Sequence, residues 1–132
     1  MSDDRGRSGR VRPTLGEAVR RAEGQIETFA FAAHERARVR EICFILAEVS
    51  LLPPGETVRV AGETLEAGLV QEVLALVRHE HVKMVLENFK SVTARVRNKK
   101  AYLRSALYQS VFELEAHYAN LVNHHAAGGE DA

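Results

Sequence analysis

The chain has 132 residues, of which 45% are hydrophobic and 27% are charged, and these values are ordinary for one soluble globular domain. Lysine plus arginine balance aspartate plus glutamate at 18 each, whereas a domain devoted to nucleic acid usually carries a net positive charge. No apolar stretch approaches the roughly 18 residues of a membrane span, so a transmembrane protein is excluded.

The N-terminal segment, residues 1–13, is predicted to be a disordered basic and polar arm, because Gly, Ser, Arg and Asp dominate it. It lacks the apolar block of a secretory signal, and the only cysteine of the chain has no disulfide partner. We therefore expect a cytoplasmic protein without membrane association. Thr14 and Glu17 have the spacing of a capping box, which predicts the start of a short helix. Its apolar residues recur at helical intervals: Val19, Ala22 and Ile26.

A core helix is predicted over residues 35–51 and a β-hairpin after it. The apolar residues of the helix lie on one face: Val39, Ile42, Cys43, Leu46 and Val49. Pro53-Pro54-Gly55 ends this helix. Residues 57–60 and 63–65 are expected to pair as two short strands around an Ala61-Gly62 turn. A hairpin this short is unstable alone, so Val58 and Val60 should pack against helices.

Three further helices are predicted in the second half of the chain. Two shorter ones, over residues 70–77 and 82–89, each repeat an apolar pattern of i, i+3, i+4 and i+7. The longest begins after Asn98, a favourable N-cap, and is predicted to run from Lys99 to about Val122. Residues 14–123 would then form one mainly α-helical domain of about five helices with a short two-stranded hairpin. Residues 124–132 are predicted to be a disordered tail.

Residues that could carry catalysis or bind a metal do not form a known pattern. His79 and His81 are separated by two positions, so on a helix they point apart, and no Cys/His ligand spacing is present. Cys43 falls on the buried face of its helix, which is typical of a structural cysteine. No glycine-rich phosphate-binding motif occurs. We expect a protein that is not an enzyme and that needs no metal or cofactor.

A dense basic cluster around residue 98 is the strongest remaining signal. Its members are Arg95, Arg97, Lys99, Lys100 and Arg104, with Tyr102 among them. Cations in the first turn of a helix oppose the helix dipole, so helix propensity does not explain them. If all five bound phosphates of a single strand, the slope of log K against log salt would be about −3.5. The cluster is interpreted as a contact surface for DNA or for a protein partner, with a solvated helix entry as the alternative.

Two aromatic residues widen the apolar face of the last helix. Tyr108 and Phe112 stand beside its main stripe, and one small core does not require that extra area. Surplus exposed apolar area marks interaction surfaces. The pair is therefore a candidate interface, either for a partner or for a second copy of the chain.

The order of several segments resembles a known family. These segments are "GETVRVAGE", "GLVQEVLALVRHEHVKMVLENF", "TARVRNKKAYLRSALYQS" and "HYANLVNH". Together they resemble the C-terminal domain of RepA-type plasmid replication initiators from Gram-positive bacteria, which is similar to DnaD-like primosomal domains. The resemblance covers residues 26–124 and is most specific at residues 58–62 and 96–107.

The resemblance implies a recruitment module rather than a catalyst. In that family an N-terminal winged-helix domain binds origin repeats, and the C-terminal domain contacts host replication proteins, including primase. The matched region here begins about 25 residues into the chain, which leaves no room for a winged-helix domain before it. DnaD-like domains also carry a Tyr-x-x-x-Ile-x-x-x-Trp pattern associated with DNA binding. The corresponding residues here are Tyr102, Ala106 and Ser110, so the stacking tryptophan is replaced.

The sequence thus predicts a non-enzymatic module of a plasmid or phage-type replication initiator. Its expected partners are host replication proteins, namely primase or the helicase-loading machinery. A first alternative is a DNA-binding module without sequence specificity, which would bind weakly through the basic cluster. A second is a structural dimerisation domain, a homo-oligomer built on Tyr108 and Phe112.

Overall fold

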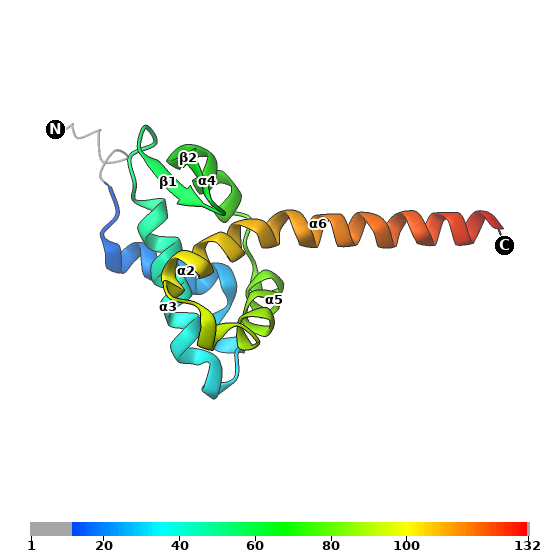
Figure 1. Cartoon of the computed structure of the whole chain (residues 1–132), viewed down its shortest axis with the longest axis horizontal. Helices are drawn as coiled ribbons and strands as arrows, with labels where there is room; N and C mark the ends of the chain where they lie inside the picture. Colours follow the sequence, from blue (N-terminus) through cyan, green and yellow to red (C-terminus); the bar gives the residue numbers. More distant parts are fainter. Residues whose placement is uncertain (1–11, 132) are drawn as a thin grey trace.

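A computed structural model describes the backbone of residues 12–131 and the side chains of residues 12–116. Helices dominate this part of the chain, as the sequence predicts, and one small hairpin accompanies them (Figure 1). The α-helices are α2 (Leu15–Ile26), α3 (Arg36–Ser50), α4 (Ala67–Leu74), α5 (His79–Lys90) and α6 (Lys99–Asp131). The strands are β1 (Thr57–Val60) and β2 (Glu63–Glu66), and short 3-10 helices are η2 (Thr28–Ala30), η3 (Ala33–Glu35) and η4 (Thr93–Arg95).

The start of α2 is the predicted capping box. The Glu17 amide donates to Thr14 Oγ1 at 3.1 Å, and the Thr14 amide donates to Glu17 Oε1 at 2.9 Å. These two bonds satisfy amide groups that the first helical turn leaves without a partner. The helix ends at Ile26, and its C-cap, Glu27, has a left-handed conformation with φ of 57°. Of the arm predicted before α2, residues 1–11 lie outside the described residues, and Arg12 donates a hydrogen bond to the Leu51 carbonyl.

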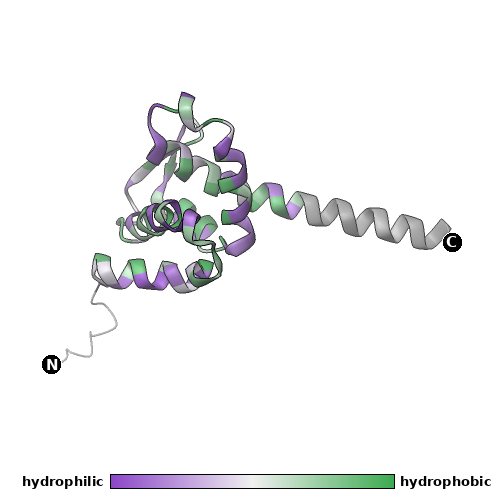
Figure 2. Cartoon of the chain, turned by 90° about the horizontal axis from the view of Figure 1, so that it is seen from below, coloured by the Kyte–Doolittle hydropathy of each residue, from purple (hydrophilic) through white to green (hydrophobic). Residues whose placement is uncertain are grey.

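Helix α3 lies in the middle of the folded body and contacts α2, α4 and α6 (Figure 1). All five apolar residues predicted for its inner face are buried, and Ile45 and Ala47 are buried as well. Along the helices of the body, hydrophilic and hydrophobic residues alternate as amphipathic helices require (Figure 2). The core is therefore assembled around the helix with the clearest sequence pattern.

The hairpin has the predicted strands and the predicted turn. Val60 pairs with Glu63, which leaves Ala61 and Gly62 as a two-residue turn. Both have positive φ, 54° and 82°, as a type I′ turn requires. The Ala61 amide donates to Ser105 Oγ at 2.8 Å and thereby ties the turn to α6. Val58 and Val60 are buried, so the hairpin is held by helices as expected.

Two glutamine side chains join the helices through carbonyl groups at helix ends. The Gln25 amide donates to the carbonyls of Leu74 and Val77 at 3.0 and 2.8 Å. The Gln71 amide donates to the carbonyls of Val49 and Leu52 at 2.9 and 2.7 Å. The last carbonyls of a helix have no partner within the helix. These contacts supply partners at the ends of α4 and α3.

Helix α6 begins as predicted but extends further. The Ala101 amide donates to Asn98 Oδ1 at 3.0 Å, so Asn98 is the N-cap. The predicted end near Val122, with a disordered tail from residue 124, is not what the backbone shows, because the helix runs to Asp131. Two glycines near the end each lower helix propensity by about 1 kcal/mol. Neither removes a backbone donor as proline would, so the hydrogen-bonded helix continues.

The second half of α6 projects from the body. Leu103, Leu107 and Val111 are buried, and Val111 is the last buried residue among the α6 side chains that are described. Beyond it the helix runs away from the other elements (Figure 1). We call residues 112–131 the α6 arm. Within the described part of the chain, no helix has both the length and the apolar character needed to cross a membrane.

Candidate functional site

The predicted basic cluster contains cations that bind other elements of the fold and cations that do not. Lys100 Nζ lies 2.5 Å from Glu48 Oε1 on α3, so this lysine is an ion-pair partner. Arg104 Nε donates to the Arg59 carbonyl of β1 at 3.2 Å. Arg95, Arg97 and Lys99 are exposed and form no ion pair with any described side chain. The cluster is therefore partly structural, since two of its cations join α6 to α3 and to the hairpin.

Tyr102 does not stand on the open surface beside these cations. Its side chain is half-buried, and its ring centroid lies 5.4 Å from that of Phe89 in α5. Phe89 covers one side of the Tyr102 ring, so a base could stack on Tyr102 only from the other side. Tyr102 therefore contributes to the packing between α6 and α5.

The cations of α6 border a groove between α3 and the start of α6. Two adjoining hollows of about 360 and 310 Å³ form it, and both are lined by Glu48 and Lys100. The Lys100–Glu48 ion pair therefore lies between them. The remaining walls of the first hollow are Arg38, Glu41, Phe44, Ile45 and Lys99. The second hollow adds the hairpin and the end of α3, through Val49, Leu52, Thr57, Val58, Arg59 and Arg104. We call the two hollows together the α3–α6 groove.

The α3–α6 groove combines an apolar floor with a charged rim. Phe44 is half-buried and Ile45 is buried, and Lys99 is exposed at the rim. Glu41 forms an ion pair with Arg38, whose guanidinium nitrogen lies 2.5 Å from Glu41 Oε1. Sequence reasoning found the α6 side of this groove but missed Phe44 and Arg59. The available signal was Phe44, an apolar residue next to the buried stripe of its helix.

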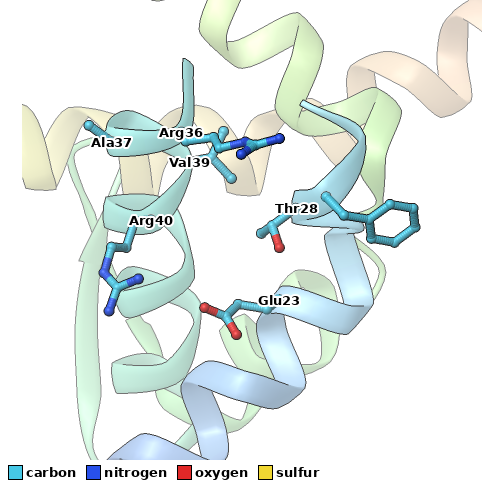
Figure 3. A pocket seen from close by; sticks show the side chains of 7 residues that line it. Glu23, Thr28, Arg36, Ala37, Val39 and Arg40 are labelled. Atoms are coloured by element: carbon cyan, nitrogen blue, oxygen red, sulfur yellow. The ribbon is translucent and has the colours of Figure 1, made fainter. Parts of the chain in front are cut away.

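A separate hollow, which is not part of the α3–α6 groove, lies between α2 and α3 and has a volume of about 400 Å³. Glu23 of α2 and Arg40 of α3 face each other across it, with Thr28 and Arg36 nearer its other end (Figure 3). Phe29 borders this hollow and is 78% exposed, which is the highest value among the large apolar residues described. The sequence analysis predicted neither this hollow nor the exposure of Phe29. The two sides of the hollow come from different helices, so no local sequence pattern reveals it.

Cys43 lies in the core, as its helical position predicts. Its exposed fraction is 0%, and burial, with the Glu23 carboxylate as a smaller cause, raises the pKa of the thiol to about 11. A nucleophilic cysteine needs a thiolate near neutral pH. The Cys43 thiol is protonated in that range, so its contribution is packing.

The two histidines of the His79-Glu80-His81 segment point to different contacts, as predicted. His79 packs on Phe31 with ring centroids 4.2 Å apart, and its Nδ1 lies 3.3 Å from the Ile26 carbonyl. His81 Nδ1 accepts a hydrogen bond from the Arg78 amide at 2.8 Å at the start of α5. No group of three or more metal-ligating side chains occurs among the residues that the structure describes.

Stability should depend on pH through His81. Burial lowers the pKa of His81 below its ordinary value of 6.5, and protonation would turn the acceptor Nδ1 into a donor facing the Arg78 amide. A lowered pKa in the folded state means that the stability is fully present above about 6.5 and is lost as pH falls below it. Urea unfolding should therefore show a lower midpoint at pH 5.5 than at pH 7.5.

The matched variant for this prediction is His81→Gln. Glutamine at the third helical position can still accept the Arg78 amide but does not titrate. The difference between the two pH values should shrink in this variant. An unchanged difference would assign the pH dependence to other groups.

The predicted aromatic pair is present on α6. The ring centroids of Tyr108 and Phe112 are 5.4 Å apart, at an angle of 56°. Phe112 is 53% exposed, and Tyr108 is half-buried. The pair thus leaves a large apolar surface uncovered at the point where the α6 arm leaves the body.

Comparison with known proteins places the chain in a family. A family model described as a family of unknown function, DUF6017, matches residues 27–129. The chain belongs to the DUF6017 family. The match covers both walls of the α3–α6 groove and the Tyr108–Phe112 pair, whereas α2 lies before it. The groove is therefore formed within the DUF6017 region. No curated protein and no solved structure gave a significant match to the chain.

Proposed function

We propose that the chain is a non-enzymatic interaction module of a DNA replication initiator, which recruits host replication proteins such as primase. The α3–α6 groove is the observation that carries this proposal. Its apolar floor, Phe44 and Ile45, lies beside the exposed cation Lys99. A cavity of this kind suits a segment of a partner protein that carries both apolar and acidic side chains.

The recognition mode that fits the groove is a helix or strand of the partner laid along α3. Amphipathic helices commonly bind in apolar grooves through side chains spaced three and four residues apart. The cations at the rim would orient such a segment and increase its association rate more than its final affinity. The replication role is supported by the resemblance of residues 26–124 to the C-terminal domain of RepA-type initiators.

Binding to purified primase and helicase-loading proteins tests the proposal. Phe44→Ser should weaken binding of the full chain by about 10-fold because it alters the floor of the groove, and Lys99→Glu, at the rim, should weaken it by a smaller factor. Isothermal titration calorimetry measures both effects. Lys83→Glu, an exposed reversal on α5 that borders no part of the groove, is the matched control and should bind as the wild type does.

Two outcomes would contradict the docking proposal. One is the absence of binding to either class of replication protein at high concentration. The other is binding that Phe44→Ser and Lys99→Glu leave unchanged, since the partner would then use a different surface.

DNA binding is the second candidate, and three exposed cations favour it. Arg95, Arg97 and Lys99 are the exposed members of the cluster that have no described ion pair. If only these three meet phosphates of a single strand, the slope of log K against log salt becomes about −2. Fluorescence anisotropy with labelled single strands at several salt concentrations measures this slope. Binding that Lys99→Glu does not weaken would eliminate this candidate.

A further inference from the structure

One side of α6 carries a ridge whose charge changes along the helix. Residues four apart lie above one another on a helix surface, so Lys100, Arg104, Tyr108 and Phe112 follow one line. Glu115, three residues after Phe112, continues it and is exposed. The ridge is thus basic at its start, aromatic in the middle and acidic at its far end.

Such a ridge is complementary to itself only in the antiparallel direction. When two copies of α6 lie antiparallel, the basic start of each faces the acidic end of the other, and the aromatic residues meet in the centre. In a parallel arrangement the same charges would face each other and repel. A surface that matches its own copy after a two-fold rotation is what a symmetric dimer requires.

The positive and negative charges of the whole chain are also unevenly distributed on the two sides of Arg104. All 18 lysines and arginines lie at or before Arg104, whereas 4 of the 18 acidic residues lie after it. The chain up to Arg104 therefore carries a net charge of +4, and the remainder carries −4. An acidic arm and a basic body attract each other. The α6 arm cannot reach the basic body of its own chain, because the continuous helix directs it away (Figure 1).

None of the described side chains of the α6 arm, residues 112–116, is buried in its own chain. The arm spans about 30 Å at the rise of an α-helix, and helices shorter than about 12–15 residues and without tertiary contacts are only marginally stable in water. An arm only slightly longer than this limit gains most from a surface that covers it. Phe112 at its base is already half exposed to solvent.

We propose that α6 is the seam of a homodimer, in which two α6 helices pair antiparallel about a two-fold axis between Tyr108 and Phe112. Tyr108 of each copy then lies opposite Phe112 of the other. Arg104 lies within one turn of Glu115 of the second copy. The α6 arm of each copy extends along the cationic start of the other α6, beside Lys100.

The dimer also gives the α3–α6 groove a means of control, and this consequence rests on the proposed function. Lys100 and Arg104 line the groove and lie on the ridge. The arm of a second copy would therefore cover part of the groove, so that a partner protein and the second copy would compete for it. Dimer formation is measured without any partner, so the failure of either proposal can be recognised separately.

Sedimentation velocity of the full chain over a range of concentrations tests the dimer. The wild type should form a dimer that weakens as salt rises. Glu115→Arg and Arg104→Glu should each raise the dissociation constant by about 10-fold, because like charges then meet across the seam. The double variant should recover most of the wild-type affinity. Phe112→Ser, at a half-exposed position, should also weaken the dimer by about 10-fold or more.

The matched control is Glu113→Arg. Glu113 is exposed like Glu115 but lies two positions away, about 200° around the helix, and so faces away from the seam. It should leave the dissociation constant unchanged. A chain that stays monomeric at the highest concentration overturns the proposal. The proposal is also overturned if neither Glu115→Arg nor Arg104→Glu changes the dissociation constant of the dimer. It is overturned as well if Glu113→Arg weakens association as much as Glu115→Arg does.

Discussion

Leu107→Ala should lower the free energy of unfolding by about 3 kcal/mol, which is the usual cost of removing a fully buried leucine side chain. Leu107 is 0% exposed and belongs to the α6 segment that contacts α3, α4, α5 and β1. Removing it leaves a cavity where these elements meet. Urea unfolding followed by circular dichroism measures the loss, and the melting temperature should fall by about 10 °C.

The matched control for this prediction is Leu76→Ala. Leu76 is 55% exposed, so the same three carbon atoms are removed from a position that is already in water. Its effect should stay within about 0.5 kcal/mol. Equal effects of the two substitutions would mean that α6 is not anchored through Leu107.

Ser110→Trp should destabilise the protein by about 3 kcal/mol or more and should not create a DNA-binding site. Ser110 is 0% exposed, and its hydroxyl donates to the Leu107 carbonyl at 2.6 Å. An indole ring at this position can neither reach solvent nor fit in the space that the serine side chain fills, so it must displace packed core residues. Under the proposed resemblance to DnaD-like domains a tryptophan would stand at this position, so the substitution tests whether such a residue could act here.

Thermal unfolding and single-strand binding should be measured on the same Ser110→Trp sample. Ser110→Ala is the control. It removes the hydroxyl without adding volume and leaves no buried donor unpaired, so it should change stability by less than about 1 kcal/mol. A stable tryptophan variant that binds single strands more tightly than the wild type would show that residue 110 can reach the surface.

Much of the fold follows from local patterns in the sequence. The capping box at Thr14, the N-cap at Asn98 and the Ala61-Gly62 turn were all predicted, and hydrogen bonds or backbone angles confirm each of them. These features depend on residues at most four positions apart. Their chemistry can therefore be read without knowing what lies across the core.

The end of α6 shows where local reasoning fails. A disordered tail was predicted from residue 124, yet the helix continues to Asp131 through two glycines. A weak preference of about 1 kcal/mol per glycine does not end a helix unless another conformation offers better hydrogen bonds. Tyr102 is a similar case, because its amphipathic position did not reveal that Phe89 would cover one face of its ring.

The sequence alone determined which residues are apolar, where most helices begin and which residues form the basic cluster, because these depend on neighbours along the chain. Only the tertiary structure decided that Lys100 pairs with Glu48, and that Phe44 of α3 joins Lys99 of α6 in one groove. These pairs are separated by about 50 positions in the sequence. Their contacts depend on how α6 crosses α3, and helix packing sets that geometry through the shapes of many side chains together.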